Sequence, residues 1–364
     1  MENEWNLRND DIIESEADPV LQEDLEGIAE GSCPLEVYAG TTILVTGATG
    51  LIGSQIVKAL ACANRKKDLQ IRILALARSR EKAQKVFGRL LDRGDVVFVQ
   101  GDVNQELVVE EPVDYIVHGA SATSSRYFVT NPVETIRTAL DGTRHVLELG
   151  QNKQVKGMVY LSSLEVYGVP DGGLNSVKEE DYGYIDPLSV RSSYSEGKRM
   201  AECLCVAYAD EYQVPVKIVR LSQTFGAGVA YEDGRVFAEF ARCVIEKRNI
   251  VLHTAGNTLR TYCYTADAVN GILTVLARGE KGQAYNISNK DTGVTIREMA
   301  EIVCHTFPES GIAVTFDMPA DLQSYGYNPE MVIRLNTDKL EQLGWRAQVS
   351  LPEMYRRMIR SFGK

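Results

Sequence analysis

The sequence predicts an α/β protein in which a doubly wound parallel sheet binds a nucleotide and a smaller, interleaved C-terminal part binds a substrate. Three observations support this fold class. A short apolar strand, Ile43 to Val45, leads directly into glycines at 47, 50 and 53, and a helical pattern follows. Apolar strands then alternate with helical segments as far as residue 221, which is typical of a parallel sheet covered on both faces. Beyond that residue the regular alternation is lost, which indicates the second part.

The chain has 364 residues, enough for one large domain or two interlocked domains. It contains no run of eighteen apolar residues, and its N-terminus has neither a basic start nor an apolar core. We therefore expect no membrane span, no ordinary secretory signal and a cytoplasmic protein. The seven cysteines form no CxxC pair and occur with only four histidines, so we expect reduced thiols and no metal site.

The net charge of −11 comes from the N-terminal end of the chain. Residues 1–36 hold twelve acidic residues and one base, Arg8, and removing them from the totals of 50 acids and 39 bases leaves 38 of each. We therefore predict an acidic N-terminal arm on a neutral body. Neither part offers the basic surface that neutralises nucleic-acid phosphates, so no nucleic-acid partner is expected.

One short helix is predicted within this arm. Asp18 can cap it, Pro19 suits its first position, and Leu21, Leu25 and Ile28 share one apolar face. Such a face needs a partner, and most amphipathic faces pack on the core of their own chain. Contact with another subunit is the alternative.

The three glycines after the first strand have separate functions in a phosphate-binding loop. One permits a tight turn, one lets the backbone approach a pyrophosphate, and one lets the next helix pack against its strand. The start of that helix offers amides and a positive dipole end to the phosphates. An ordinary structural turn is the alternative, but the strand before the loop and the helix after it favour the nucleotide.

The following segments continue the βαβ alternation. Helices are expected at about Ser54–Asn64 and Arg80–Asp92, and strands at Ile71–Leu76, Val96–Val99 and Asp114–His118. We interpret His118 as a core residue, and the sequence GASATSS follows it. Asn131, Pro132 and Glu134 then predict a capping box at the start of a helix that reaches about Gln151.

The fifth strand, Met158 to Ser162, delivers the sequence SSLEVYG to the carboxyl edge of the sheet, where such folds bind their ligands. A loop rich in glycine, proline and charge, residues 169–193, separates this strand from a helix that begins near Tyr194. A sixth strand is expected at Val216 to Leu221.

Tyr194 and Lys198 are four residues apart on the predicted helix and therefore share one face. A tyrosine with the ordinary pKa of about 10 is a poor base, but an adjacent ammonium and an oxidised nicotinamide both favour the phenolate. Tyr194 can then take the proton of a substrate hydroxyl while hydride leaves for the cofactor. Ser163, at the end of the fifth strand, can hold that hydroxyl in line. A surface Tyr–Lys pair is the alternative, and the glycine loop and Ser163 favour catalysis.

The sequences TGATGLIG and SSLEVYG and the Tyr194–Lys198 pair resemble those of the extended short-chain dehydrogenase/reductase family, the nucleotide-sugar epimerases, dehydratases and decarboxylases. The resemblance spans residues 41–364. Within it, HGASATSSRYFVTNPVETIRTALDGT, YSEGKRMAE, RLSQTFG, EDGRV and LRTYCYTADAV most resemble UDP-glucuronate decarboxylases. It implies a Rossmann fold, a sugar that is oxidised at C4 with bound NAD(P), and a homodimer.

The resemblance assigns catalysis to Ser163, Glu165, Tyr194 and Lys198. Together with the pattern of the residues themselves, it gives the other expected contacts. Cofactor contacts are expected at Gly47, Thr49, Gly50, Leu51, Ile52, Gly53, Arg78, Ser79, Arg80, Asp102, Val103, Gly119, Ala120, Tyr194 and Lys198. Substrate contacts are expected at Ser121, Arg191, Gln223, Arg235 and Arg260.

Two of these roles have alternatives. A negative Glu165 would discourage a charged substrate carboxylate and so favour loss of CO₂ from a C4 ketone. A strand-end acid that binds a backbone amide is the other interpretation. Arg260 suits a bidentate phosphate contact, and a surface salt bridge is its alternative.

Three departures from the decarboxylase pattern affect the expected reaction. Leu164 stands where the resembling decarboxylases have serine and 4,6-dehydratases have a proton-donating aspartate, and an apolar side chain cannot donate a proton. Gln223 replaces the usual asparagine. The second strand is followed by Arg78, Ser79 and Arg80 instead of an acid for the ribose diol of NAD. Two guanidinium groups suit a 2′-phosphate, which favours NADP; NAD, with Arg78 stacked on adenine, is the alternative.

We therefore predict a nucleotide-sugar enzyme most like a UDP-glucuronate decarboxylase. A 4-epimerase is the alternative, and a non-enzymatic cofactor-sensing or scaffold protein is the third hypothesis. Apolar residues between Met200 and Tyr208 predict a homodimer formed through the helix that starts at Tyr194.

The predicted domains divide the chain three ways: the arm at residues 1–36, a nucleotide domain of residues 41–221 with 266–288, and a substrate domain of residues 222–265 with 289–364. Tyr325 and Tyr327 are candidates to line the substrate pocket or to pack within it.

Overall fold

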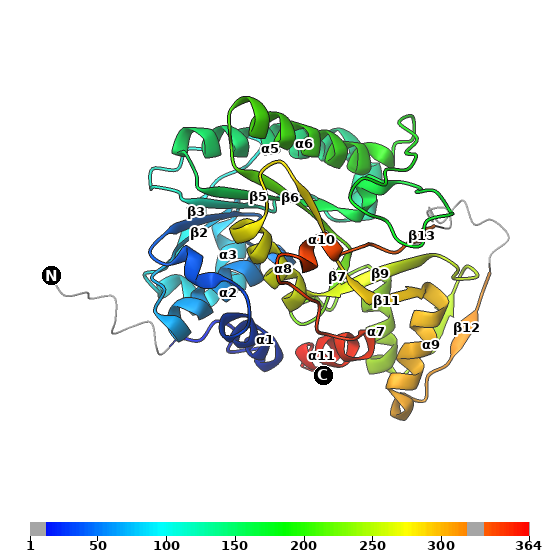
Figure 1. The fold of residues 1–364 in the computed structure, drawn as a ribbon. Helices are drawn as coiled ribbons and strands as arrows, with labels where there is room; N and C mark the ends of the chain where they lie inside the picture. Colours follow the sequence, from blue (N-terminus) through cyan, green and yellow to red (C-terminus); the bar gives the residue numbers. More distant parts are fainter. Residues whose placement is uncertain (1–11, 319–330, 364) are drawn as a thin grey trace.

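A parallel sheet of seven strands organises the molecule in a computed structural model that describes residues 12–318 and 331–363 (Figure 1). The strand order is β10-β6-β5-β4-β1-β2-β3, and every neighbouring pair is parallel. The strands are β1 (Thr42–Thr46), β2 (Arg72–Ala77), β3 (Val96–Gln100), β4 (Tyr115–His118), β5 (Gly157–Ser163), β6 (Val216–Leu221) and β10 (Ala284–Ile287). The predicted doubly wound α/β fold is confirmed.

Helices cover both faces of this sheet. Figure 1 shows α5 (Pro132–Lys153) and α6 (Ser192–Glu211) over one face, and α2 (Leu51–Lys67), α3 (Arg80–Phe87) and α8 (Thr265–Arg278) over the other. Successive residues of a strand point to opposite faces. Accordingly Ile43 and Val45 of β1 belong to the core with α2 and α8, while Leu44 belongs to the core with α5 and α6. Strands buried on both faces explain the continuous apolar runs in the sequence.

A second, smaller lobe is built around another sheet. It contains β7 (Gln223–Phe225), β9 (Leu259–Tyr264), β11 (Asn289–Thr295) and β13 (Val332–Ile333), and a separate pair joins β8 (Ile250–Leu252) with β12 (Val314–Phe316). Helices α7 (Val236–Glu246), α9 (Ile296–Thr306) and α11 (Leu351–Ser361) share its apolar core, and the short α10 (Asp338–Glu341) lies beside β10. Between these segments the chain returns to the large sheet as α8 and β10. The domain boundaries drawn from the sequence stay a prediction.

The expected N-terminal helix is α1 (Pro19–Glu30). Asp18 accepts a hydrogen bond from the backbone N of Leu21 at 3.0 Å, and the apolar face is buried in the core that includes α2 and α8. Packing on the same chain, rather than on another subunit, is thus confirmed for this face. Asp24 also joins α1 to α11, because it accepts hydrogen bonds from Arg357 at 2.7 Å and from Tyr264 at 2.5 Å. Residues 1–11 of the predicted arm lie outside the described residues.

Two local predictions are wrong. The helix expected to reach Asp92 ends at Phe87, because Gly88 has a φ of 51° and the chain continues as a 3₁₀ segment, η2 (Gly88–Asp92). Asn131 stands directly before α5, but its side chain accepts no capping hydrogen bond, and its amide donates to Thr130 at 2.9 Å. The structure also has a short helix between β4 and α5 that the sequence did not indicate, α4 (Ser125–Thr130).

The described residues contain no helix long and apolar enough to cross a membrane. They also contain no group of three potential metal ligands, and all seven cysteines are free thiols.

Candidate active site

The glycine loop between β1 and α2 has the geometry of a phosphate cradle. Gly47 has a φ of 67°, and a Cβ there would lie 2.7 Å from the carbonyl carbon of Gly119. A Cβ on Gly53 would lie 2.3 Å from the oxygen of Gly47, so this glycine lets α2 pack against the loop. Gly50 has only the Gly47 oxygen nearby, at 3.3 Å, and no side chain caps α2. The loop is therefore open to a pyrophosphate at the amide end of the helix, and these residues fit a dinucleotide.

The remaining predicted cofactor residues surround this loop. Thr49, Leu51 and Ile52 belong to the loop and the first turn of α2. Gly119 and Ala120 follow β4, and the Ala120 amide donates to the hydroxyl of Thr46 at 3.3 Å. After β3, Asp102 accepts a hydrogen bond from the Asn104 amide and Val103 is buried.

The end of β2 carries the residues that were predicted to select the cofactor. Arg78, Ser79 and Arg80 are all exposed. The Ser79 hydroxyl accepts a hydrogen bond from the Lys82 amide at 3.1 Å and so caps α3, and the Arg80 guanidinium lies 5.6 Å from the centre of the Phe98 ring. Within the described part of the chain Arg78 has no ion pair or side-chain hydrogen bond, which leaves it the available cation at this edge.

Ser163, Tyr194 and Lys198 meet at the carboxyl edge of the large sheet. Ser163 is the last residue of β5, and its hydroxyl accepts a hydrogen bond from the Glu165 amide at 3.2 Å; Tyr194 lies in the first turn of α6, close enough for the Ser163 hydroxyl to lower the pKa of the phenol. Lys198 is 3% exposed and donates from Nζ to the backbone oxygen of Leu161 at 2.7 Å. Its Nζ lies 5.8 Å from the centre of the Tyr194 ring.

Burial dominates the electrostatics of these groups. It raises the pKa of Tyr194, the charge of Glu165 raises it further, and the Ser163 hydrogen bond, Arg191 and Arg235 lower it. Burial also lowers the pKa of Lys198 to about 8, against an opposing effect of Glu202. The phenol is therefore protonated at neutral pH in this structure, and the positive charge of an oxidised nicotinamide would act in the direction that releases its proton.

Glu165 lies in η3 (Leu164–Tyr167), directly after Ser163. Its carboxylate accepts a hydrogen bond from Arg191 at 2.9 Å and another from the hydroxyl of Ser195 at 3.1 Å. The alternative in which Glu165 binds a backbone amide does not match these partners. The carboxylate is instead half of an ion pair.

Phe128 is a component of the site that the sequence did not indicate. Its ring stacks on the Tyr194 ring with centroids 4.1 Å apart and an interplanar angle of 9°. The Arg191 guanidinium carbon lies 5.0 Å from the centre of the Phe128 ring. Phe128 belongs to α4, a helix that the sequence did not indicate, and its position 66 residues before Tyr194 gave no periodic signal.

Leu164 points into an apolar cluster formed with Val166, Tyr167, Val177, Ile333 and Leu335, and it is 3% exposed. It provides no proton donor next to Ser163. His118 is likewise a core residue, as predicted: it is 1% exposed, and its ring nitrogens contact the hydroxyls of Thr46 and Thr143.

The predicted substrate residues differ in whether their polar groups are free to bind a substrate. Among the residues that the structure describes, the buried Nε of Arg260 has no hydrogen-bond partner, and its Nη2 contacts the sulfur of Met331 at 3.3 Å. Arg235 instead forms a two-pronged pair with Asp233, at 2.9 and 2.6 Å. In β7, Gln223 lies opposite Tyr262, two residues from Arg260 along β9. Ser121 donates to the backbone oxygen of Ala122. Tyr325 and Tyr327 lie outside the described residues.

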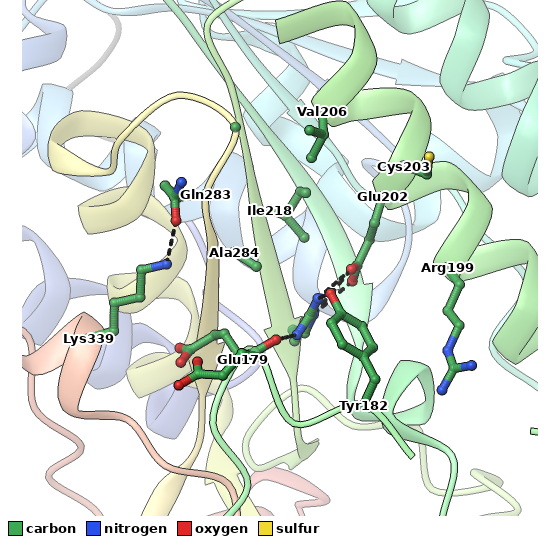
Figure 2. Close-up of a pocket in the computed structure, with 13 residues that line it drawn as sticks. Glu179, Tyr182, Arg199, Glu202, Cys203, Val206, Ile218, Gln283, Ala284 and Lys339 are labelled. Atoms are coloured by element: carbon green, nitrogen blue, oxygen red, sulfur yellow. Dashed lines mark hydrogen bonds and ion pairs between the residues drawn. The ribbon is translucent and has the colours of Figure 1, made fainter. Parts of the chain in front are cut away.

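A cavity of about 540 Å³ lies beside α6, against β6 and β10, and contains none of the predicted site residues (Figure 2). Its central charges are already matched, because Arg220 donates to Glu202 at 3.0 and 2.6 Å, to the Tyr167 hydroxyl at 3.0 Å and to the Glu179 backbone oxygen at 2.6 Å. Because these charged groups already pair with one another, we do not place the reactive centre in this cavity, although it is large. The unpartnered groups and the Tyr–Lys–Ser arrangement lie elsewhere.

Comparison with known proteins gives consistent matches along most of the chain. Residues 43–288 match the NAD dependent epimerase/dehydratase family. UDP-glucuronic acid decarboxylase 6 of Arabidopsis thaliana is 32% identical over 313 residues, which cover 85% of this chain and 85% of that protein. UDP-glucuronic acid decarboxylase 1 of Danio rerio is 27% identical, over 88% of this chain and 72% of its own length.

Solved structures share the fold. The dTDP-glucose 4,6-dehydratase DesIV from Streptomyces venezuelae, with NAD bound, has a TM-score of 0.72 and 25% identity, over 88% of this chain and 97% of that chain. The UDP-glucose 4-epimerase from Thermotoga maritima, with UDP-glucose, has a TM-score of 0.74 and 21% identity, over 88% and 98% of the two chains. The latter likeness is one of fold.

Proposed function

The chain belongs to the NAD dependent epimerase/dehydratase family, and from this premise we propose that it acts as a UDP-glucuronate decarboxylase. It is an NAD(P)-dependent nucleotide-sugar enzyme. The proposed reaction oxidises C4 of the glucuronic acid, releases CO₂ from the resulting β-keto acid, and reduces the C4 ketone of the remaining pentose. The nucleotide stays attached to the sugar throughout.

One arrangement carries the proposal: Ser163, Tyr194 and Lys198 lie together at the sheet edge with Glu165 beside them. Tyr194 takes the proton of the C4 hydroxyl, Ser163 holds that hydroxyl in line, and Lys198 fixes the position of the tyrosine. A nicotinamide cofactor held by the glycine loop of Gly47, Gly50 and Gly53 would supply the hydride acceptor and donor for C4, which would leave the overall reaction redox-neutral.

Arg260 supports the nucleotide-sugar part of the proposal. Its Nε is buried and finds no partner in the described part of the chain, and a buried donor of that kind costs free energy until an acceptor arrives. A diphosphate supplies such acceptors, and guanidinium binds phosphate through paired charge-assisted hydrogen bonds. We assign Arg260, rather than the already paired Arg235, to the sugar diphosphate.

A 4-epimerase is the second candidate, and Leu164 is the observation that favours it. A 4-epimerase reduces the C4 ketone from its other face, and this step needs no proton donor at position 164. The same residue weighs against a 4,6-dehydratase, which needs a donor for the leaving hydroxyl. The decarboxylase remains the main proposal because the curated relatives named above carry that activity.

The test uses purified protein with added NAD or NADP and UDP-glucuronate labelled with ¹³C at C6. We expect labelled CO₂ and a UDP-pentose in equal amounts. Tyr194→Phe should lower turnover by about a thousandfold, because general base catalysis is worth factors of this order, while the cofactor still binds. Tyr212→Phe, an exposed tyrosine of the same helical region, is the matched control and should keep full activity.

Interconversion of UDP-glucose and UDP-galactose without labelled CO₂ would establish the epimerase instead. Activity of Tyr194→Phe within a few fold of the parent would overturn the assignment of the base.

A further inference from the structure

Arg191, which was expected to bind substrate, is occupied by the protein itself. It stands immediately before α6, and its guanidinium donates to Glu165 at 2.9 Å and lies over the Phe128 ring. Two serines strengthen the same assembly: Ser193 donates to the backbone oxygen of Phe128 and Ser195 to the Glu165 carboxylate, both at 3.1 Å. The start of α6 therefore holds both α4 and η3 against Tyr194.

The charges around Tyr194 come from four elements. Glu165 in η3 is the acidic one, and Arg191 and Lys198 from α6 and Arg235 before α7 are the basic ones; the phenol of Tyr160 in β5 is a further titratable neighbour. A negative carboxylate opposes formation of a phenolate nearby, most strongly where little water screens it. An arginine held against that carboxylate forms a compact dipole with it. The field of a dipole falls off faster with distance than the field of a single charge.

We propose that Arg191 is a positioning residue for the reaction: by pairing with Glu165, it lets Tyr194 lose its proton beside a carboxylate. The proposal rests on Tyr194 being the base proposed above. It gives Glu165 and Arg191 one joint role, in which the carboxylate stays next to the substrate without keeping the base protonated.

In the alternative, Arg191 binds the substrate directly, and this role predicts a different behaviour of its side chain. An arginine that binds an anionic group of the substrate would have to leave Glu165, or share its donors with it, each time substrate arrives. Its removal would then act mainly on KM. A residue that acts through Glu165 acts instead on the ionisation of Tyr194, and when Glu165 is neutral only the direct effect of its own charge remains.

A direct titration separates these roles without any substrate. The full chain is made with 2,3,5-trifluorotyrosine at position 194, whose fluorinated phenol is much more acidic than tyrosine, and its ionisation is followed by ¹⁹F NMR. The measurement is repeated in Arg191→Gln, Glu165→Gln and the double variant. Arg144→Gln, which removes a cation from an exposed ion pair on α5, is the control for loss of one positive charge.

We expect Arg191→Gln to raise the midpoint by about one pH unit, the scale of a neighbouring charge in a partly buried site. Glu165→Gln should lower it, removal of Arg191 should raise it clearly less in the Glu165→Gln background than in the parent, and the control should match the parent. An unchanged midpoint in Arg191→Gln, or an equal rise with and without Glu165, would overturn the proposal.

The result of the titration does not depend on the result of the turnover assay, so either proposal can be contradicted without the other. If no sugar nucleotide is converted, the ¹⁹F midpoints still decide whether Arg191 acts through Glu165. If UDP-glucuronate is converted, the acidic limb of the kcat profile should move to higher pH in Arg191→Gln with little change in KM. A large rise in KM with an unmoved pH profile would make Arg191 a substrate ligand.

Discussion

Arg78 is the residue on which the choice of cofactor depends. Its exposed guanidinium at the end of β2 has no partner in the described chain, and no carboxylate occupies the position that would bind a ribose diol. We expect NADP to bind more tightly than NAD, and Arg78→Ala to weaken NADP binding about tenfold, the value of one charge-assisted hydrogen bond. Arg89→Ala, an exposed arginine of η2, is the control.

Titration calorimetry with both dinucleotides measures this, and analysis of the dinucleotide released on denaturation identifies the resident one. NAD that binds more tightly than NADP, with an affinity unchanged by Arg78→Ala, would contradict the prediction.

His118 makes folding stability depend on pH. Burial, assisted by the nearby charge of Lys198, lowers its pKa to about 3, whereas an unfolded histidine has a pKa of about 6.5. Between these values the unfolded chain binds a proton that the folded chain does not, so the stabilising contribution is present above pH 6.5 and is lost as the pH falls towards 3. The parent should lose about 1 kcal/mol more per pH unit than His118→Gln between pH 6 and 4.

Urea unfolding at a series of pH values gives both slopes. His305→Gln, which changes an exposed histidine, should keep the slope of the parent. Equal slopes in the parent and in His118→Gln would show that His118 is protonated in the folded state.

The elements differ in how far local sequence determines them. Tyr194 and Lys198 share a face because they are about one helical turn apart, and the glycines at 47 and 53 lie in one loop and helix start, so spacing was enough to predict both. Glu165, Phe128 and Arg191 meet because three separate elements converge, and no local period encodes that meeting. The Asn131 side chain donates to Thr130 and makes no capping bond, a choice between local partners that composition cannot decide.

The helix α1 should contribute strongly to stability, although it lies outside the region matched by the family. Leu25 is fully buried in its apolar face. We expect Leu25→Ala to lower the free energy of unfolding by about 3 kcal/mol, the usual loss for a buried leucine. Leu188→Ala is the matched control, since Leu188 is 92% exposed, and it should be neutral. A loss under 1 kcal/mol for Leu25→Ala, by urea unfolding, would show that α1 is only loosely attached.

At the scale of the whole molecule, we predict a homodimer formed through the outer faces of α5 and α6. These faces expose apolar side chains: Val133 is 61%, Ile136 40% and Met200 56% exposed, and Leu140 and Ala207 line a shallow depression between the two helices. A face of this kind on adjacent helices is suited to a two-fold, self-complementary contact.

Light scattering after gel filtration at micromolar concentration should give twice the chain mass. Ile136→Glu combined with Met200→Glu should give a monomer, while Val251→Glu, a charge placed at an exposed position in β8, should remain dimeric. A monomeric mass for the parent would contradict the prediction.

The contact between α1 and α11 joins segments that are far apart in synthesis. Asp24 is paired with Arg357, 333 residues later, and the Asp18 carboxylate accepts a hydrogen bond from Ser361. Because synthesis runs from α1 towards α11, Asp24 lacks the cation that compensates its burial until α11 has been made. A chain truncated before residue 351 would therefore leave α1 without its partner in the smaller lobe.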